Sequence, residues 1–307
     1  MIDGSSLQAL LEAGEFVVTS EIGPPKSADG GPVREKARML KGFADAFNVT
    51  DNQTAIVRMS SLAASLFCIQ EGVEPIMQMT CRDRNRLAMQ SEMLGAAALG
   101  VRNMLCITGD HQRFGNQPES RNVFDLDSTQ QLMVFRRMCD EGEMWCGDSI
   151  KVPPKMFLGA AANPFADPME MGIIRLNKKV CAGADFIQTQ AIFDLDRFRE
   201  WHRLLVSKGL HERTHILAGV LPLRSYKAAR FMADKVPGMS VPDDLLRRMS
   251  NASDEKAEGM RICLETIDEL RDLPGIKGIH LMPVNWESAV PEIVERAGLL
   301  PRPHARR

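Results

Sequence analysis

Polar residues that could act as acids, bases or hydrogen-bonding groups follow the apolar runs of this sequence. Glu21 comes directly after the run 16–20, just before a Gly-Pro-Pro turn. A carboxylate held at a partly apolar mouth gains proton affinity because desolvation disfavours its charged form. Glu21 is therefore a candidate general acid. The alternative is a helix-capping or salt-bridged glutamate.

Other candidates end later runs. Asp110 follows Gly109, which would let the backbone approach a ligand; the alternative is an Asx turn that opens a loop. Gln188 and Gln190 should face the same side of a strand, because side chains alternate with period two. We expect Gln190, nearer the strand end, to bind a polar heterocycle through both ends of its amide. One of Lys178 and Lys179 could meet a phosphate, or both could lie on a solvated helix face.

Strand-like and helix-like segments alternate eight times along the chain. Parallel strands that alternate with helices close into a barrel, and the carboxyl ends of the strands carry the active site. We predict an α/β fold, a single (β/α)8 TIM barrel over residues 1–300, with a lead-in helix, a long loop (111–127) after strand four and a disordered tail (301–307). Glu21, Asp110 and Gln190 should then converge on one mouth. The predicted strands are 16–20, 46–50, 74–80, 103–108, 156–162, 184–190, 215–220 and 277–282, and the predicted helices are 1–13, 33–43, 60–71, 84–99, 128–140, a fifth ending at 181, 195–207, 242–273 and 287–297.

Composition excludes several classes of function. The 307 residues are 44% hydrophobic and carry a formal net charge of −2, so nothing favours nucleic acid. No apolar run approaches the ~20 residues of a membrane span, and no signal peptide begins the chain, so we expect a cytoplasmic protein. Seven cysteines without a CxxC, and six scattered histidines, predict no metal site and no iron–sulfur cluster held by this chain alone. No Gly-x-Gly-x-x-Gly or Walker loop occurs, so rim loops would have to hold any nucleotide or flavin.

Several segments, taken in order, resemble the methylenetetrahydrofolate reductase family. Residues 20–26 (Ser-Glu-Ile-Gly-Pro-Pro-Lys) are similar to its Glu-x-x-Pro-Pro segment, and 179–190 to its Lys-Val-x-Ala-Gly-Ala-x-x-x-x-Thr-Gln run. The resemblance extends from about residue 16 to 298, and the block ending at Gln190 is its most specific part. Shorter similarities are Asn-Val-Thr at 48–50, Thr-Cys at 80–81, Gly-Asp at 109–110 and Ala-Gly-Val-Leu-Pro at 218–222.

The resemblance implies a flavoprotein, with FAD or FMN, that reduces 5,10-methylenetetrahydrofolate to 5-methyltetrahydrofolate. Glu21 would be the general acid that opens the five-membered ring, and hydride would pass from N5 of the reduced flavin. Asp110 would lie by flavin and folate, Gln190 would hold the pterin, and Tyr226 would be the aromatic over the folate. The flavin-contacting positions that match are Thr50, Gln78, Thr108, Asp110, Asn163 and Lys179.

Departures from the family pattern leave two questions open. Gln78, Thr108 and Asn163 replace common histidine, arginine and tyrosine residues near the outer part of FAD, so FAD and FMN both remain possible. Trp286 replaces an arginine in the last motif, which leaves the electron donor open between NAD(P)H and an iron–sulfur partner subunit. Trp286 could anchor such a partner in an oligomer or heteromeric complex, or it could pack over the flavin or the core.

A second hypothesis keeps the barrel but makes it a non-catalytic pterin-binding or scaffold subunit of a methyl-transfer complex. The joint presence of Glu21, Asp110 and Gln190 argues against it. A zinc-dependent methyl-transferring barrel lacks a convincing Cys/His ligand set.

Overall fold

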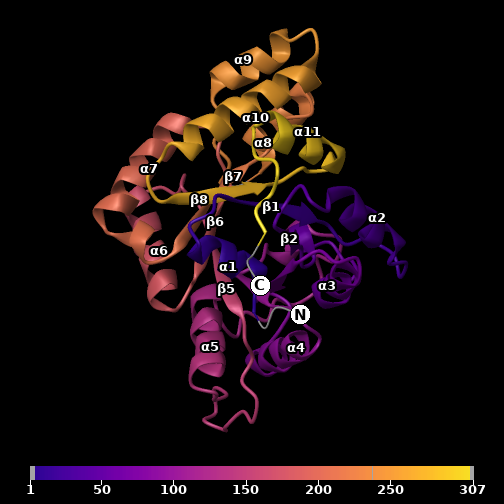
Figure 1. Cartoon of the computed structure of the whole chain (residues 1–307), viewed down its shortest axis with the longest axis vertical. Helices are drawn as coiled ribbons and strands as arrows, with labels where there is room; N and C mark the ends of the chain where they lie inside the picture. The colour runs from indigo at the N-terminus through magenta and orange to yellow at the C-terminus, as the bar shows by residue number, and fades with distance from the viewer. Residues whose placement is uncertain (1–3, 237, 305–307) are drawn as a thin grey trace.

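Eight parallel strands close on themselves into a barrel in sequence order, and β8 pairs with β1 (Figure 1). The computed structural model describes residues 4–236 and 238–304. Each strand leads through a helical connection to its neighbour, which confirms the predicted TIM barrel. The strands are β1 (Val17–Ile22), β2 (Ala46–Val49), β3 (Pro75–Thr80), β4 (Asn103–Ile107), β5 (Phe157–Ala162), β6 (Phe186–Ala191), β7 (His215–Val220) and β8 (Ile276–Leu281).

Helices surround the barrel, and their bounds follow the predicted ones closely except near the C-terminus. The segment 242–273, predicted as one helical region, is two helices separated by a break at which the Asp254 side chain caps the second. A further helix begins after Ser225, which was not predicted. The helices are α1 (Ser6–Glu12), α2 (Gly31–Leu40), α3 (Ser61–Gln70), α4 (Arg86–Ala98), α5 (Ser128–Asp140), α6 (Met169–Cys181), α7 (Leu195–Ser207), α8 (Tyr226–Lys235), α9 (Asp243–Asn251), α10 (Glu255–Arg271) and α11 (Val290–Arg296), with 3₁₀ turns η1 (Gln53–Ala55), η2 (Gln112–Phe114), η3 (Leu210–Glu212) and η4 (Glu287–Ala289).

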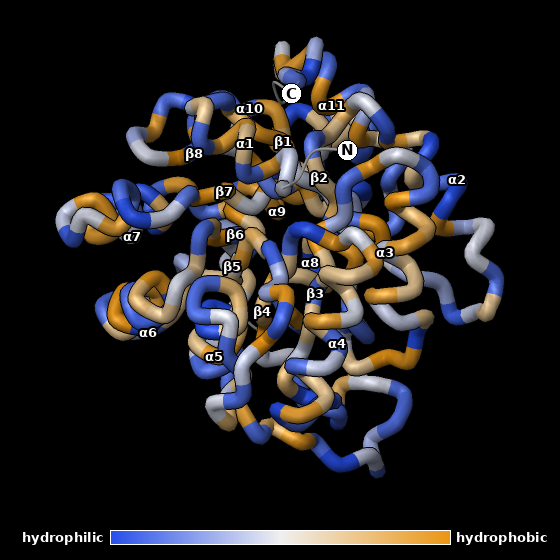
Figure 2. Tube along the Cα trace, turned by 60° about the horizontal axis from the view of Figure 1, so that its bottom comes forward, coloured by the Kyte–Doolittle hydropathy of each residue, from blue (hydrophilic) through white to orange (hydrophobic). Residues whose placement is uncertain are grey.

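The lower part of the barrel is apolar and closed by α1. Inward residues near the strand starts, among them Val17, Phe157 and Phe186, form one cluster with Leu7 and Leu10 of α1. Figure 2 shows hydrophobic segments concentrated in the central strands and hydrophilic ones in the outer loops. A ligand can therefore approach the barrel interior only from the opposite end, where the strands finish.

The long loop after β4, predicted at 111–127, is tied to neighbouring loops of the same rim. It contains η2, and the Asn116 side chain accepts a hydrogen bond from the backbone of Val57 at 3.1 Å. Val123 donates to the carbonyl of Arg82 at 2.8 Å. A Cβ atom on Gly115 would lie 1.7 Å from the carbonyl oxygen of Ala55, so only glycine allows this approach. The loops after β2, β3 and β4 thus form one connected wall.

The tail differs from the expected disorder in the part that the structure describes. Arg302 is 8% exposed and forms an ion pair with the buried Asp45 at 2.5 Å. It also donates to the carbonyls of Phe16 and Leu299, both at 2.8 Å. Residues 301–304 are therefore ordered against the start of the barrel, because a buried carboxylate there requires a cation; residues 305–307 lie outside the described part. Across residues 4–236 and 238–304, no helix is long and apolar enough to cross a membrane.

Candidate functional site

A cavity of about 400 Å³ opens where the strands end. Five of the residues predicted to contact cofactor or substrate line it, and they come from β3, the loops after β4 and β5, α6 and β6. These five are Gln78, Thr108, Asn163, Lys179 and Gln190. Hydrogen-bonding side chains from five parts of the chain therefore surround one space, as in a pocket for a polar heterocycle.

Gln190 is presented by an irregularity in β6. The register between β6 and β7 shifts between Gln188 and Ala191. Thr189 stabilises this bulge: its hydroxyl donates to the Gln190 carbonyl at 2.9 Å and accepts from the backbone of Gly219 at 2.8 Å. The Gln190 side chain has no hydrogen-bond partner within the described residues, so both ends of its amide are available to a ligand.

One wall of the cavity favours negative charge. Lys179 donates to the carbonyl of Ala161 at 2.7 Å, and burial lowers the pKa of its ammonium group. Ser128, the first residue of α5, lines the same wall, and its hydroxyl lies 3.2 Å from that of Thr108. The Asp127 carboxylate already caps the amino end of α5, so the positive charge on this wall is that of Lys179. An anionic or electron-rich ligand group would be stabilised here, and it would offset the desolvation of Lys179.

Beneath the cavity lies a buried layer of polar side chains in place of the usual aliphatic ones. Asn48 and Gln188 exchange two hydrogen bonds, at 2.6 and 3.0 Å, across the barrel. The remaining Gln188 amide hydrogen faces the Thr19 hydroxyl at 3.2 Å and His280 Nδ1 at 3.4 Å. All four residues are at most 3% exposed. Interior layers of TIM barrels are normally branched aliphatic residues, so this layer indicates a functional requirement.

Glu21 stands between the main cavity and a second, smaller one. Its Oε1 lies 3.6 Å from Nε2 of His280, which lines the main cavity. Glu21 itself lines the second cavity, of about 230 Å³. There Lys36 is paired with Glu287, and Arg58 donates to the carbonyl of Pro24 at 3.1 Å. The Glu21 carboxylate is 15% exposed; it lines the smaller cavity and adjoins the main cavity through His280.

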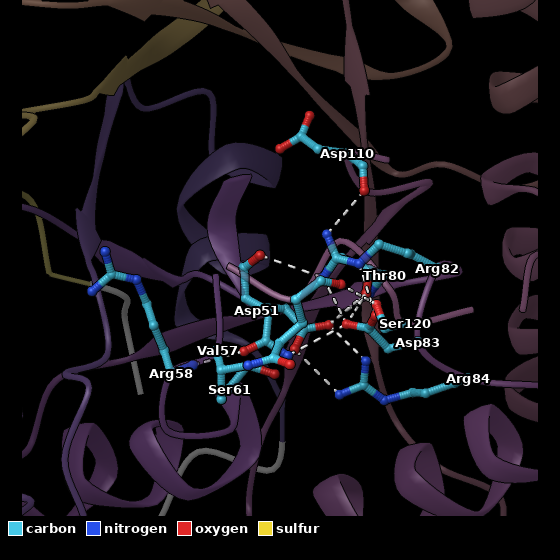
Figure 3. A network of polar contacts seen from close by, with 12 residues as sticks. Asp51, Val57, Arg58, Ser61, Thr80, Arg82, Asp83, Arg84, Asp110 and Ser120 are labelled. Atoms are coloured by element: carbon cyan, nitrogen blue, oxygen red, sulfur yellow. Dashed lines mark hydrogen bonds and ion pairs between the residues drawn. The ribbon is translucent and has the colours of Figure 1, made fainter. Parts of the chain in front are cut away.

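Asp110 lies on the same rim but lines neither of these two cavities. Its backbone carbonyl accepts from Arg82 at 3.1 Å, while its side chain is exposed and points away from the network in Figure 3. In that network Asp51 is buried and binds Arg84 at 2.6 Å and the backbone of Thr80 at 2.9 Å. Ion pairing with Asp51 raises the pKa of Arg84 in spite of its burial. The predicted convergence of Glu21, Asp110 and Gln190 thus holds for the rim and not for a single cavity.

Three other predicted residues have varied surroundings. The hydroxyl of Thr50 is buried with no hydrogen-bond partner among the described residues, beside the Gly-Pro-Pro turn. Tyr226 lies outside the main cavity, where it packs against the cluster formed by α8, α9 and α10. Trp286 is half-buried and packs against the main core. The alternative in which it packs on the core describes its position.

Sequence reasoning missed His280, Asn48 and Thr19 as members of the site. Each lies two residues before a rim position on its strand, as Gln188 does before Gln190. The detectable signal was a polar residue inside a barrel strand, one period below the strand end.

Comparison with known proteins agrees with this geometry. The family model for methylenetetrahydrofolate reductase matches residues 6–298. Among curated relatives, a probable methylenetetrahydrofolate reductase (NADPH) of Caenorhabditis elegans is 24% identical over 95% of this chain and 44% of its own length. The 5,10-methylenetetrahydrofolate reductase of Salmonella typhimurium is 23% identical over 75% of this chain and 72% of its own length.

This chain thus spans less than half the length of the Caenorhabditis elegans relative. Among solved structures, a Clostridium thermocellum protein that binds two copies of 5-methyl-5,6,7,8-tetrahydrofolic acid has the same fold. Its TM-score is 0.67 at 14% identity, over 96% of this chain and 99% of that one. The match of the family model over nearly the whole chain shows that it belongs to the methylenetetrahydrofolate reductase family.

Proposed function

We propose that this protein reduces 5,10-methylenetetrahydrofolate to 5-methyltetrahydrofolate with a flavin held in the main cavity. The observation that carries the proposal is the unpartnered amide of Gln190 in a polar cavity beside Glu21. A pterin ring presents adjacent donors and acceptors that one amide can bind together. Membership of the family supports the same substrate.

The residues around the main cavity fit a flavin. Lys179 favours an electron-rich ring, and the buried hydroxyl of Thr50, on the same rim, has no hydrogen-bond partner among the described residues. Thr108, Gln78 and Asn163 supply further polar contacts. A bound flavin, FAD or FMN, would supply the hydride that reduces the folate.

Glu21 is proposed as the general acid. Opening the five-membered ring breaks a carbon–nitrogen bond, and the leaving nitrogen takes a proton from Glu21, which leaves a cationic iminium. Hydride addition at that carbon then completes the methyl group, so that one proton and one hydride are consumed. Asp110, a carboxylate in the rim loop after β4, is proposed to stabilise the cation electrostatically.

The test of this function is spectroscopic and catalytic. The purified protein should be yellow, and mass spectrometry of the released chromophore should identify FAD or FMN. Chemically reduced protein, mixed anaerobically with methylenetetrahydrofolate, should regain the oxidised flavin spectrum and form 5-methyltetrahydrofolate. A protein that binds 5-methyltetrahydrofolate without flavin and without turnover would instead be the pterin-binding subunit of the alternative hypothesis.

The electron donor is proposed to be an iron–sulfur partner subunit, with NAD(P)H as the competing donor. The support is the absence of arginine at position 286, where a half-buried tryptophan stands. Stopped-flow mixing with NADH in the absence of oxygen decides the question. Slow, non-saturating flavin bleaching supports the partner, whereas rapid bleaching at micromolar NADH shows that no partner is required.

A further inference from the structure

The two ring nitrogens of His280 face different partners. Nδ1 points down into the buried polar layer, 3.0 Å from the hydroxyl of Thr19 and 3.4 Å from Nε2 of Gln188. Nε2 points up to Glu21, with 3.6 Å between Nε2 and Oε1. The His280 side chain is 4% exposed, and these are its polar contacts within the described residues.

The lower partners determine which nitrogen carries the proton. Asn48 donates to Gln188 Oε1 and accepts from Gln188 Nε2, which orients that amide with its second N–H towards Thr19 and His280. Thr19 accepts from this group and can donate its single hydroxyl hydrogen to Nδ1, its nearer acceptor; the Ile279 carbonyl is 3.3 Å away. The Thr19 hydroxyl and the Gln188 amide both donate towards Nδ1, so Nδ1 is an acceptor. The neutral ring therefore carries its proton on Nε2.

We propose that His280 is a positioning residue for Glu21: its Nε2–H, locked upward by Thr19, Gln188 and Asn48, holds the Glu21 carboxylate at the border of the two cavities. The inference rests on the proposed role of Glu21 as the acid. The separation of 3.6 Å makes the contact one of an N–H dipole with a carboxylate. Such contacts in a free enzyme commonly shorten when substrate binds.

His280 does not supply the proton itself. Below it lie a hydroxyl and two amides that are at most 2% exposed, and none of them exchanges protons near neutral pH. Glu21 must therefore be reprotonated from the side of the cavities. On that side the charged groups are Arg58 and the Lys36–Glu287 pair, and they line the smaller cavity with Glu21. The buried layer serves to fix an orientation, which explains why polar residues are kept inside the barrel.

The first experiment measures the tautomer directly. Nitrogen-15 NMR of the histidine-labelled protein, with His280 assigned by its substitution, should show a pyrrole-like Nε2 and a pyridine-like Nδ1 near neutral pH. A proton on Nδ1 would mean that the Thr19 hydroxyl accepts from the ring and donates to the Ile279 carbonyl, so that a lone pair faces Glu21, and it would overturn the proposal. This measurement is independent of substrate, so it holds even if the proposed reaction proves wrong.

The second experiment is a double-mutant cycle. His280→Leu should slow folate reduction by the pre-reduced protein about 100-fold, the cost of a misplaced catalytic group. His280→Gln, which keeps an N–H donor, should recover most of that rate. In the Glu21→Gln background, His280→Leu should slow the reaction further by less than about threefold, because residues that act through one another are not additive.

Two controls separate positioning from a merely structural role. The affinity for 5-methyltetrahydrofolate, measured by calorimetry, should change less than about threefold in both His280 variants. The reason is that His280 is proposed to affect the rate through Glu21 and not the binding of folate. If the losses from Glu21→Gln and His280→Leu multiply, or if folate affinity falls as much as the rate, His280 only maintains the fold. If the parent protein does not turn over the folate at all, the proposed function fails while the tautomer result remains valid.

Discussion

Two glutamines of one strand have different environments and therefore different roles. Gln188 is fully engaged with Asn48 inside the barrel, whereas the Gln190 amide, one period higher, is unpartnered within the described residues. His280 and Glu21 differ in a similar way: the His280 side chain is 4% exposed at the floor of the main cavity, and that of Glu21 is 15% exposed beside the smaller one. At the scale of single residues, height within the barrel decides whether a polar group supports the site or meets the substrate.

Glu21→Gln should slow folate reduction by about 10²–10⁴-fold, the usual value of general acid catalysis, while flavin remains bound. The measurement is single-turnover oxidation of the reduced flavin by methylenetetrahydrofolate. Glu287→Gln is the matched control, because this residue lines the same small cavity but is paired with Lys36. Near-parental rates in Glu21→Gln would remove this residue from the role of acid.

Asp110→Asn should raise the flavin reduction potential, because removal of a nearby negative charge stabilises the electron-rich reduced ring. The carboxylate is exposed, so the shift should shrink as salt is added. A potentiometric titration at low and high ionic strength measures both effects. An unchanged or lower potential at low salt would place Asp110 away from the ring.

At the scale of elements, the irregular end of β6 presents the pterin ligand, and Gly219 on β7 permits it. A Cβ atom at residue 219 would lie 2.4 Å from the carbonyl oxygen of Thr189 and 2.6 Å from that of Gln190. Both oxygen atoms belong to the backbone, so the steric clash could be relieved only if the bulge itself moved. The presentation of Gln190 therefore depends on a glycine in the neighbouring strand.

Gly219→Ala should destabilise the protein by about 1–3 kcal/mol, as overpacking does, and weaken binding of 5-methyltetrahydrofolate. Chemical denaturation and calorimetry measure the two effects. Gly95→Ala in α4 is the control: its Cβ would meet nothing within 4 Å, and alanine is favoured in a helix by roughly 0.5–1 kcal/mol. Unchanged folate affinity in Gly219→Ala would show that the bulge does not position Gln190.

At the scale of the whole molecule, the end of the described chain is bound to its beginning. Arg302 joins Asp45 at the start of β2 to the carbonyl of Phe16 before β1. Burial raises the pKa of Asp45, while Arg302 acts in the opposite direction. The ion pair with Arg302 thus favours the charged form of the Asp45 carboxylate, whereas burial favours the neutral form.

Arg302→Ala should lower the free energy of unfolding by about 3 kcal/mol near neutral pH, because it leaves a buried carboxylate unpaired. Without Arg302 the folded-state pKa of Asp45 rises further above its unfolded value. Above that folded-state pKa the charged form is penalised, so the loss should shrink as the pH falls and Asp45 binds a proton. Urea denaturation at neutral and mildly acidic pH tests this; a loss that does not depend on pH would mean that the arginine acts only through its packing and carbonyl bonds.

Local patterns in the sequence determined the barrel and the rim. Eight apolar runs ending in polar residues, separated by helical segments, predict a closed barrel and place Glu21, Asp110 and Gln190 on its rim. Helix α8 and the break between α9 and α10 were not predicted, because α8 and α9 lie in a satellite cluster whose contacts come from residues far along the chain. Periodicity identifies which face of a strand points inward, and this information is local.

Only the tertiary structure decided what each inward or rim group meets. The register across the closed barrel brings His280 of β8 beside Thr19 of β1, and no local signal couples residues 261 positions apart. The direction of the Asp110 carboxylate, the burial of Trp286 and the pairing of Arg302 with Asp45 likewise depend on loops and termini that meet only after the barrel closes. Side-chain alternation is a property of one strand, whereas hydrogen-bond partners and burial are properties of the closed assembly of all eight.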